Sequence, residues 1–424
     1  MSTFSQLRNF SIVWVTAIVL ACFSHTVAQT SYKVTDLGTL NNDNFGMAMG
    51  LNNHGWTENM DGVVNPPINS LLTTVAKGRA VINIDGLNID LGTLGGSNSW
   101  INWGGINDRG EAVGMAETSV PDPDGEDICA FGTKLTCRPF LWRDGHMRAL
   151  PTVGGNNGQA SAINNRGDVA GFAETTIPDS GCPPGAPGKT ASPVLWEKGQ
   201  AQALPTVGGD PDGVAFGIND EGQAVGYSGS CTTAFHAVTW ENGTAHPLPD
   251  NGHARSNIAY AINNQGQIVG QVRSPDGTAF LAALWQNGAL TNLGTLPGEH
   301  AAFATSINSR GQVVGSAFDS ALNWSRGFIW QDGVMTDLNT MFPADSNLFV
   351  ISASNINERG QISGMATVLS GPDAGNIHSF LATPVHASIG RSVADVAPIH
   401  PKSNFPANAC NHLSQKFGPG RFEK

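Results

Sequence analysis

Charge, helical periodicity and basic patches are all scarce in this sequence. Charged residues make up 13% of the chain, against about 25% in an average soluble domain. The 22 Lys and Arg against 34 Asp and Glu give a net charge of −12 with no basic stripe, which argues against a nucleic-acid partner. Beyond residue 28 no segment sustains the apolar spacing of an amphipathic helix, whereas 52 Gly and 24 Pro supply frequent turns. These shortages predict an all-β protein.

Long apolar runs are also missing, except for one near the N-terminus. Arg8 is the only charge in residues 1–28, an apolar run covers Ile12–Phe23, and Thr26 and Ala28 occupy the small-residue positions of a cleavage site. The run is shorter than the ~20 residues needed to cross a bilayer, which favours a signal peptide over a retained anchor. Lipidation at Cys22 is a less favoured alternative. We therefore predict a secreted or surface-held protein without a transmembrane span after cleavage, with the periplasm as another compartment.

One short word recurs seven times. Six copies read Ile-Asn-x-x-Gly and one reads Leu-Asn-x-x-Gly, and successive copies start 44 to 57 residues apart. They begin at Leu51, Ile106, Ile163, Ile218, Ile262, Ile307 and Ile356. Six copies continue to a second Gly, as in Ile106–Gly114, and only the first copy loses this ending. A period of this length is typical of β-propeller blades.

A second word, apolar-x-Trp-x-x-Gly, occurs in five of the repeats. Its Trp residues are Trp142, Trp196, Trp240, Trp285 and Trp330, while Asn83 and Ala382 take the Trp place in the first and last repeats. Both words put a polar turn ending in Gly between short apolar runs, which indicates a hairpin with a left-handed glycine. Each repeat therefore predicts two hairpins, or four strands. Identical placement predicts that the Trp side chains pack between blades rather than form an exposed sugar-stacking platform.

The two ends of the repeat array complement each other. The first strand, Tyr32–Leu37, lies where a fourth strand belongs, and the last unit stops at its third strand near Ala382. Pairing these strands would complete a seventh blade and remove the open edges. An open solenoid is the alternative, but it would need polar capping repeats, which are not apparent. The sequence thus predicts a seven-bladed β-propeller of four-stranded antiparallel blades over 29–383, with a poorly ordered tail over 384–424.

Several words of the repeat resemble a known family. They read Leu-Gly-Thr-Leu-Gly-Gly at 91–96, Ile-Asn-Asp-Arg-Gly at 106–110 and His-Ala-Val-Thr-Trp at 236–240. On these words, residues 32–383 resemble the bacterial HAF repeat family of extracellular proteins. The name-giving His-Ala-Phe triplet is altered here to His-Ser-Phe at 378–380, Arg-Pro-Phe at 138–140 and Arg-Gly-Phe at 326–328. The resemblance implies export and repetition, and it brings no catalytic residue or ligand.

Two neighbouring repeats carry insertions, at 117–139 and 174–193. Because alternate strands run in opposite directions, these connections share the face opposite the short turns, and we expect ligand contacts to gather there. In the first insertion, oxygen ligands for a calcium ion are offered by Asp122, Asp124, Glu126 and Asp127. The stretch lacks the full spacing of a calcium-binding loop, so a solvated acidic turn is the favoured interpretation. No other cofactor is predicted.

Five cysteines follow the predicted leader, and an exported chain can form disulfides. Cys129 and Cys137 lie within one insertion and are predicted to pair. Cys182 and Cys231 occupy equivalent connections of neighbouring repeats and are predicted to pair across them, with free buried thiols as the alternative. Cys410, in the tail, is left as a free thiol, an intermolecular disulfide or a link to a partner.

The repeated Asn invites interpretation as a seven-fold binding code. Asn favours turns by bonding its own backbone, however, so we predict a structural role. After Asn52 of the first copy, the predicted turn residues are Asn107 and Gly110, Asn164 and Gly167, Asn219 and Gly222, Asn263 and Gly266, Asn308 and Gly311, and Asn357 and Gly360.

Three functions stay open at this point. The leading hypothesis is a monomeric, non-catalytic binding module for an extracellular glycan or protein, acting through the insertion-bearing face. The alternatives are a propeller-type hydrolase or lyase acting on extracellular polysaccharide through acidic residues near the axis, and a structural or adhesive surface protein. The sequence contains no zinc-protease motif, nucleophile elbow or phosphate loop. We therefore predict no catalytic residue and lean against an enzyme.

Overall fold

The chain is an all-β protein, as its composition predicted. The computed structural model describes residues 30–64, 75–179, 182, 188–231, 233–253, 255–319 and 325–385. Within these ranges the structure consists of strands and two short 3-10 helices, η1 (Leu40–Asn42) and η2 (Leu338–Met341). Neither described helix is long and apolar enough to cross a membrane. The predicted signal peptide at 1–28, Cys22 and Cys410 lie outside the described residues, as does the tail from residue 386.

The strands form antiparallel groups of four, and five of these groups are separate sheets made of consecutive strands. Group 2 contains β6 (Gly95–Ile106), β7 (Ala112–Pro121), β8 (Leu135–Arg143) and β9 (His146–Ala149); group 3 contains β10 (Gly158–Ile163), β11 (Val169–Pro178), β12 (Lys189–Glu197) and β13 (Gln200–Ala203). Group 4 contains β14 (Asp212–Ile218), β15 (Ala224–Ser230), β16 (Thr233–Glu241) and β17 (Thr244–Pro247); group 5 contains β18 (Ile258–Ile262), β19 (Ile268–Arg273), β20 (Phe280–Gln286) and β21 (Ala289–Gly294). Group 6 contains β22 (Ala301–Ile307), β23 (Val313–Phe318), β24 (Ser325–Gln331) and β25 (Val334–Asp337).

The remaining strands form one eight-stranded sheet that contains both ends of the described chain. Its first half, group 1, contains β2 (Phe45–Leu51), β3 (Thr57–Val64), β4 (Val75–Ile84) and β5 (Leu87–Asp90). Its second half, group 7, contains β26 (Leu348–Ile356), β27 (Ile362–Val368), β28 (Ile377–Val385) and β1 (Ser31–Gly38). The N-terminal β1 pairs antiparallel with the C-terminal β28, from Ser31 opposite Val385 to Gly38 opposite Ser379. A single parallel pair, Phe45 with Ile377, joins the two halves.

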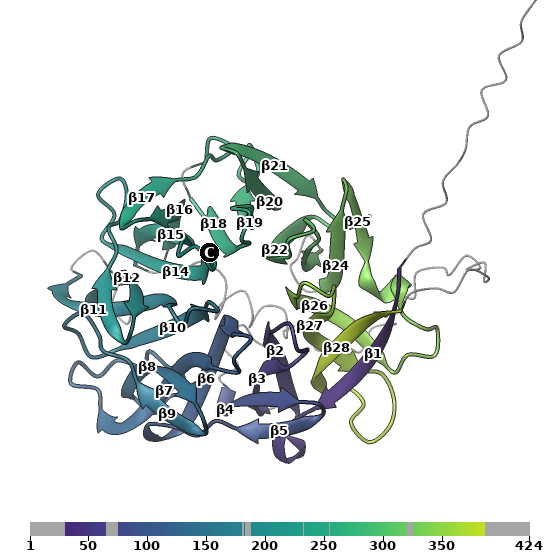
Figure 1. Cartoon of the computed structure of the whole chain (residues 1–424), viewed down its shortest axis with the longest axis horizontal. Helices are drawn as coiled ribbons and strands as arrows, with labels where there is room; N and C mark the ends of the chain where they lie inside the picture. Colours follow the sequence, from purple (N-terminus) through teal and green to yellow (C-terminus); the bar gives the residue numbers. More distant parts are fainter. Residues whose placement is uncertain are drawn as a thin grey trace, which may run out of the picture.

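The sheets are arranged around a common centre, the arrangement of a β-propeller (Figure 1). The first strand of each group, such as β10 or β14, lies nearest the centre, and the fourth, such as β17 or β21, lies toward the outside. The purple β1 lies beside the yellow-green β28, so the first and last described strands meet at the rim. Strand β28 ends at Val385, slightly beyond the predicted boundary at 383.

Two kinds of glycine turn produce the hairpins of each group. In the seven Asn-x-x-Gly turns the glycine has a φ between +72° and +91°, the left-handed region that side chains disfavour. In the Trp-x-x-Gly turns both central residues have positive φ, as with Asn242 at +49° and Gly243 at +75°. That combination defines a type I′ turn, whose twist matches that of the strands it joins.

The Trp side chains lie between neighbouring groups. Trp196, Trp240 and Trp285 are at most 2% exposed, and each packs in an apolar cluster with residues of the preceding group. Their indole N–H groups donate to the carbonyl O atoms of Pro151, Pro205 and Pro249, each at 2.7 Å. Each indole thereby holds the connection that enters its own group. Trp142 and Trp330 are partly buried against the same kind of cluster.

Candidate functional site

The Asn of each repeat turn makes hydrogen bonds within its turn and to the next turn. In group 4, Asn219 Oδ1 accepts from the backbone N–H groups of Glu221 and Gln223, at 3.1 and 2.9 Å. Asn219 Nδ2 donates to the carbonyl O of Asn263 in the next turn, at 3.1 Å. The first contact is the local role expected of Asn. The second contact has no local sequence signal, because it joins residues 44 positions apart.

The contact between turns is repeated around the molecule. Seven such bonds of 2.9–3.1 Å follow the chain order, and the seventh leads from Asn357 back to the carbonyl O of Asn52. Six of the seven Asn residues, with the Leu or Ile that precedes each, line a cavity of about 220 Å³. The Asn side chains are therefore engaged with the backbone on both sides, and the turns hold one another in place.

Three carboxylates also line this cavity, those of Asp108, Asp220 and Glu358. Each accepts the backbone N–H of the corresponding residue in the preceding turn, at 2.7–3.0 Å; the donors are Asn53, Asn165 and Ser309. An enzyme acting on polysaccharide at the axis would need acidic residues in this region. The carboxylates that the structure places there already serve as acceptors between turns.

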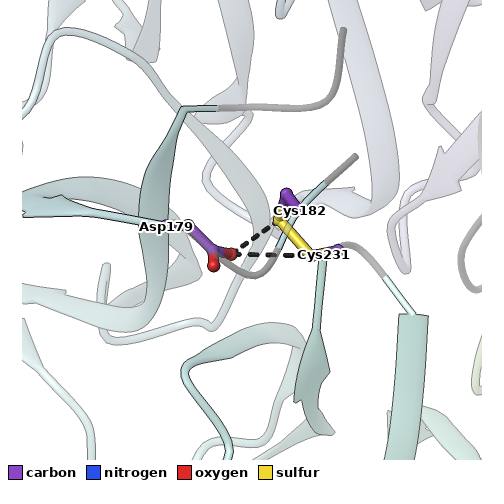
Figure 2. Close-up of side chains that lie close together, drawn as sticks. All are labelled: Asp179, Cys182 and Cys231. Carbon is purple, nitrogen blue, oxygen red and sulfur yellow. Dashed lines mark hydrogen bonds between the residues drawn. A yellow bond between two sulfur atoms is a disulfide. The ribbon is translucent and has the colours of Figure 1, made fainter. Parts of the chain in front are cut away.

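The two insertions lie at the opposite end of the sheets. They connect β7 to β8 and β11 to β12, whereas the Asn turns connect the first and second strands. Antiparallel pairing puts these connections at opposite ends. Both expected disulfides are formed: Cys129–Cys137 within the first insertion, and Cys182–Cys231 between the second insertion and the end of β15 (Figure 2). The second bridge thus ties group 3 to group 4.

Three of the four acidic residues singled out in the first insertion come together. Asp122, Asp124 and Glu126 each offer a carboxylate oxygen, and these atoms lie within 4.8 Å of one another. Asp127 points elsewhere, since its Oδ2 accepts from the backbone N–H of Gly132 at 2.8 Å. The sequence could not separate Asp127 from the others, because the turn that redirects it has no distinctive pattern.

Basic and amide groups surround this acidic cluster. Asn157 Nδ2 donates to Asp122 Oδ2 at 2.8 Å and to Glu126 Oε2 at 3.3 Å. Lys189, from the second insertion, forms an ion pair with Asp124, and the backbone N–H of Gly188 donates to Glu126. The cluster therefore binds the two insertions to each other.

Glu174, at the start of the second insertion, completes the cluster. Burial raises its pKa to about 7, and the hydrogen bond and negative charge of Glu126 act in the same direction. Its carboxylate accepts the backbone N–H groups of Asn156 and Asn157, at 3.1 and 2.9 Å. Near neutral pH a part of the Glu174 carboxyls is therefore protonated.

A carboxyl group also lies beside the second disulfide. Asp179, Cys182 and Cys231 place three ligand-type atoms within 4.8 Å (Figure 2). The two sulfur atoms are bonded to each other, so neither is a thiolate that could bind a metal. Of these three residues, Asp179 is the one whose side chain can still bind or release a proton.

The first repeat contains buried polar residues where the other repeats are apolar or small. Thr57, Glu58, Asn59 and Asp61 are at most 1% exposed. Both carboxyl oxygens of Glu58 lack a hydrogen-bond partner in the described part of the chain, and burial raises its pKa well above 4.5. Burial likewise raises the pKa of Asp61 to about 7. The sequence indicated this difference only in that the first copy of the repeat lacks the second Gly that the other six copies share.

Comparison with known proteins assigns no family and no activity. No protein-family profile matches the chain, and no curated protein matches its sequence, so the resemblance to HAF repeat proteins stays a prediction. Among solved structures, the β-propeller domain of a protease from Pyrococcus furiosus is 10% identical, with a TM-score of 0.47 over 80% of this chain and 94% of that one. A copper-bound fungal alcohol oxidase is 11% identical, with a TM-score of 0.43 over 84% and 76%. A gluconolactonase from Xanthomonas campestris is 12% identical, with a TM-score of 0.32 over 58% and 79%.

Proposed function

We propose that this protein is an exported, monomeric β-propeller of the HAF repeat type, with seven blades closed by β1, and that it binds an extracellular glycan or protein without catalysis. Its binding site is the insertion-bearing face. Export rests on the leader-like first 28 residues. The two disulfides fit an oxidising compartment.

Closure into seven blades is supported at both the rim and the centre. At the rim, β1 supplies the fourth strand that group 7 lacks, and it covers the free edge of β28. At the centre, the chain of Asn contacts returns from Asn357 to Asn52 after seven steps. An open array would leave its last Asn without this partner.

The binding proposal is carried by one observation, the cross-linking of the two insertions into a single polar platform. Lys189 and Gly188 of the second insertion bond to Asp124 and Glu126 of the first, and Cys182–Cys231 anchors the second insertion to group 4. A surface fixed in this way needs little ordering when a ligand binds, which favours affinity. Carboxylates, amides and an ammonium group side by side suit the hydroxyl groups of a glycan or the polar groups of a protein.

Calcium is proposed as an accessory ligand of the same platform. Asp122, Asp124 and Glu126 provide the hard oxygen donors that calcium prefers. A bound ion would take over the position that Lys189 now holds beside Asp124.

The test is a glycan and extracellular-protein array probed with the mature chain, followed by affinity measurement with two variants. Lys189→Met removes the ammonium of the platform, and Arg166→Met removes an exposed charge from an Asn turn on the opposite face. We expect Lys189→Met to weaken binding of the array ligand by at least tenfold, a loss of about 1.4 kcal/mol or more. Arg166→Met should leave the affinity unchanged.

Two results would contradict the proposal. Equal affinities of both variants and the wild type would remove the site from the insertion face. Absence of any ligand across both arrays would favour a structural or adhesive protein. Repeating the measurement with added calcium tests the accessory ion, which competes with Lys189 in the wild type and should therefore act on Lys189→Met at a lower calcium concentration.

A further inference from the structure

The Cys182–Cys231 disulfide has a carboxyl group directly against it. Asp179 Oδ2 lies 2.7 Å from Cys182 Sγ and 3.7 Å from Cys231 Sγ (Figure 2). Sulfur atoms joined in a disulfide carry no proton, so only the carboxyl can provide the hydrogen of this contact. This contact is therefore a hydrogen bond only when the Asp179 carboxyl carries the proton.

The proton of this contact is held by a pair of carboxyl groups. The side chain of Asp179 is hydrogen-bonded to that of Asp212, and two carboxyl groups can bond to each other only when one of them is protonated. Asp212 is fixed in turn by the backbone N–H groups of Ala191 at 2.8 Å and Cys231 at 2.6 Å. Burial raises the pKa of Asp212 to about 6, and the charge of Asp179 adds to the rise. The pair therefore holds a proton beside the disulfide below about pH 6.

The other disulfide provides a contrast within the same chain. Cys129 and Cys137 are 1% and 0% exposed, so a thiol in solution cannot reach their sulfur atoms without local unfolding. Cys182, Cys231 and Asp179 are each partly exposed. Exchange with an external thiol requires access to one sulfur and a stabilised leaving group at the other.

We propose that Cys182–Cys231 is a thiol–disulfide exchange site for external thiols, with Asp179 as the proton donor to the leaving sulfur. An external thiolate attacks Cys231 Sγ, and the electron pair of the S–S bond moves to Cys182 Sγ. Asp179 transfers its proton to that sulfur, which leaves a Cys182 thiol, an Asp179 carboxylate and a mixed disulfide on Cys231. A second external thiolate then attacks the external sulfur of the mixed disulfide, releases the oxidised thiol and leaves Cys231 as a thiolate, which takes a proton from water.

The direction of attack follows from the two distances. The leaving sulfur gains negative charge, and the donor oxygen is nearer to Cys182 than to Cys231. Exchange also has a structural consequence, because this bridge joins the second insertion to group 4. A thiol-bearing partner would be held covalently at Cys231 while the insertion is released.

The experiment treats the folded, oxidised protein with reduced glutathione and follows each cysteine by alkylation and mass spectrometry. Rates are divided by the glutathione thiolate concentration, so that ionisation of the reagent does not obscure the protein's own pH dependence. We expect Cys182 and Cys231 to react first, with glutathione on Cys231, while Cys129 and Cys137 stay oxidised. Below about pH 6 the normalised rate of Asp179→Asn should be at least tenfold lower than that of the wild type, as for loss of a general acid. Above that pH the two rates should converge.

Asp250→Asn is the matched control, since Asp250 is an exposed carboxylate on the connection that follows group 4 and should have no effect. If Asp179→Asn does not fold, Asp212→Asn serves instead, because loss of the shared proton should move the decline in rate to lower pH. Equal normalised rates for the wild type and Asp179→Asn at every pH would overturn the proposal. Simultaneous reduction of both disulfides would do the same, since it would mean that exchange proceeds through unfolding.

Discussion

Glu58→Val restores the apolar side chain that four other groups carry at the equivalent place. The equivalent residues are Val113, Val225, Val269 and Val314. Glu58 instead puts a fully buried carboxyl there, and neither oxygen is hydrogen-bonded within the described ranges. The carboxyl lies so close to Gly105 that a Cβ on that glycine would be 1.9 Å from Glu58 Oε2. The substitution therefore removes a buried polar group that has no hydrogen bond within the described residues.

A buried polar group without a hydrogen bond costs about 1–3 kcal/mol, and we expect Glu58→Val to raise the free energy of unfolding by that amount at acidic pH. Burial raises the pKa of Glu58 well above 4.5, so the folded state binds the proton more tightly than the unfolded state. The wild type therefore loses stability as the pH rises above 4.5, until the pKa of the folded state is reached. The gain from the substitution should grow over the same interval.

Urea unfolding of both proteins across this pH range measures the effect. Glu221→Val is the control, because Glu221 is exposed on an Asn turn and its loss should change stability by less than about 0.5 kcal/mol. A gain in stability that does not change with pH would refute the ionisation argument. A loss of stability would show that Glu58 has a bonding partner in solution. A stabilised variant that no longer binds the array ligand would place Glu58 in the function of the protein.

Two further substitutions test the centre and the rim. Asn219→Ala should lower the free energy of unfolding by about 2–4 kcal/mol, because it leaves backbone groups of two turns unbonded. Asn219→Asp loses the donor to Asn263 but keeps the acceptor within the turn and should cost less; equal urea midpoints for both variants would contradict the contribution of that acceptor. His378→Gln breaks the 2.9 Å pair between β28 and Asp36 of β1 and should cost about 0.5 kcal/mol near pH 5.5. The hydrogen bond that His378 donates to Asp36 raises the pKa of His378 above 6.5, so this contribution is present below pH 6.5 and disappears as the pH rises through the raised value. Burial acts to raise the pKa of Asp36, but the hydrogen bonds from His378 and Gly38 lower it below 3.8. The contribution of Asp36 to stability is therefore lost only as the pH falls below 3.8. A thermal-unfolding difference that persisted above pH 8 would contradict this assignment.

Periodicity was sufficient to predict the strands, because each repeat marks its hairpins with glycines that only a left-handed turn requires. The pairing of β1 with β28 was also predictable, since counting strands from the repeat words leaves one vacancy and one surplus strand. The contact from Asn219 to Asn263 was not, because nothing in one turn specifies the backbone atom that the next turn presents. Asp179 was missed for a related reason: its contact with Cys182 depends on how a loop closes, and sequence neighbours three apart carry no such information.

The repeats themselves offer little capacity for binding. On the Asn-turn face, each amide that repeats is already bonded to its own turn and to the next. Side chains with unusual pKa values lie where the sequence departs from the repeat. The carboxyls of Glu174 and Asp212 have raised pKa values of about 7 and about 6, and both lie beside the insertions of groups 2 and 3. Groups that exchange protons near neutral pH are uncommon among carboxylic acids and concentrate at functional sites. Under the proposed function, the similar repeats serve as a frame, and the two repeats with insertions provide the surface for recognition and thiol exchange.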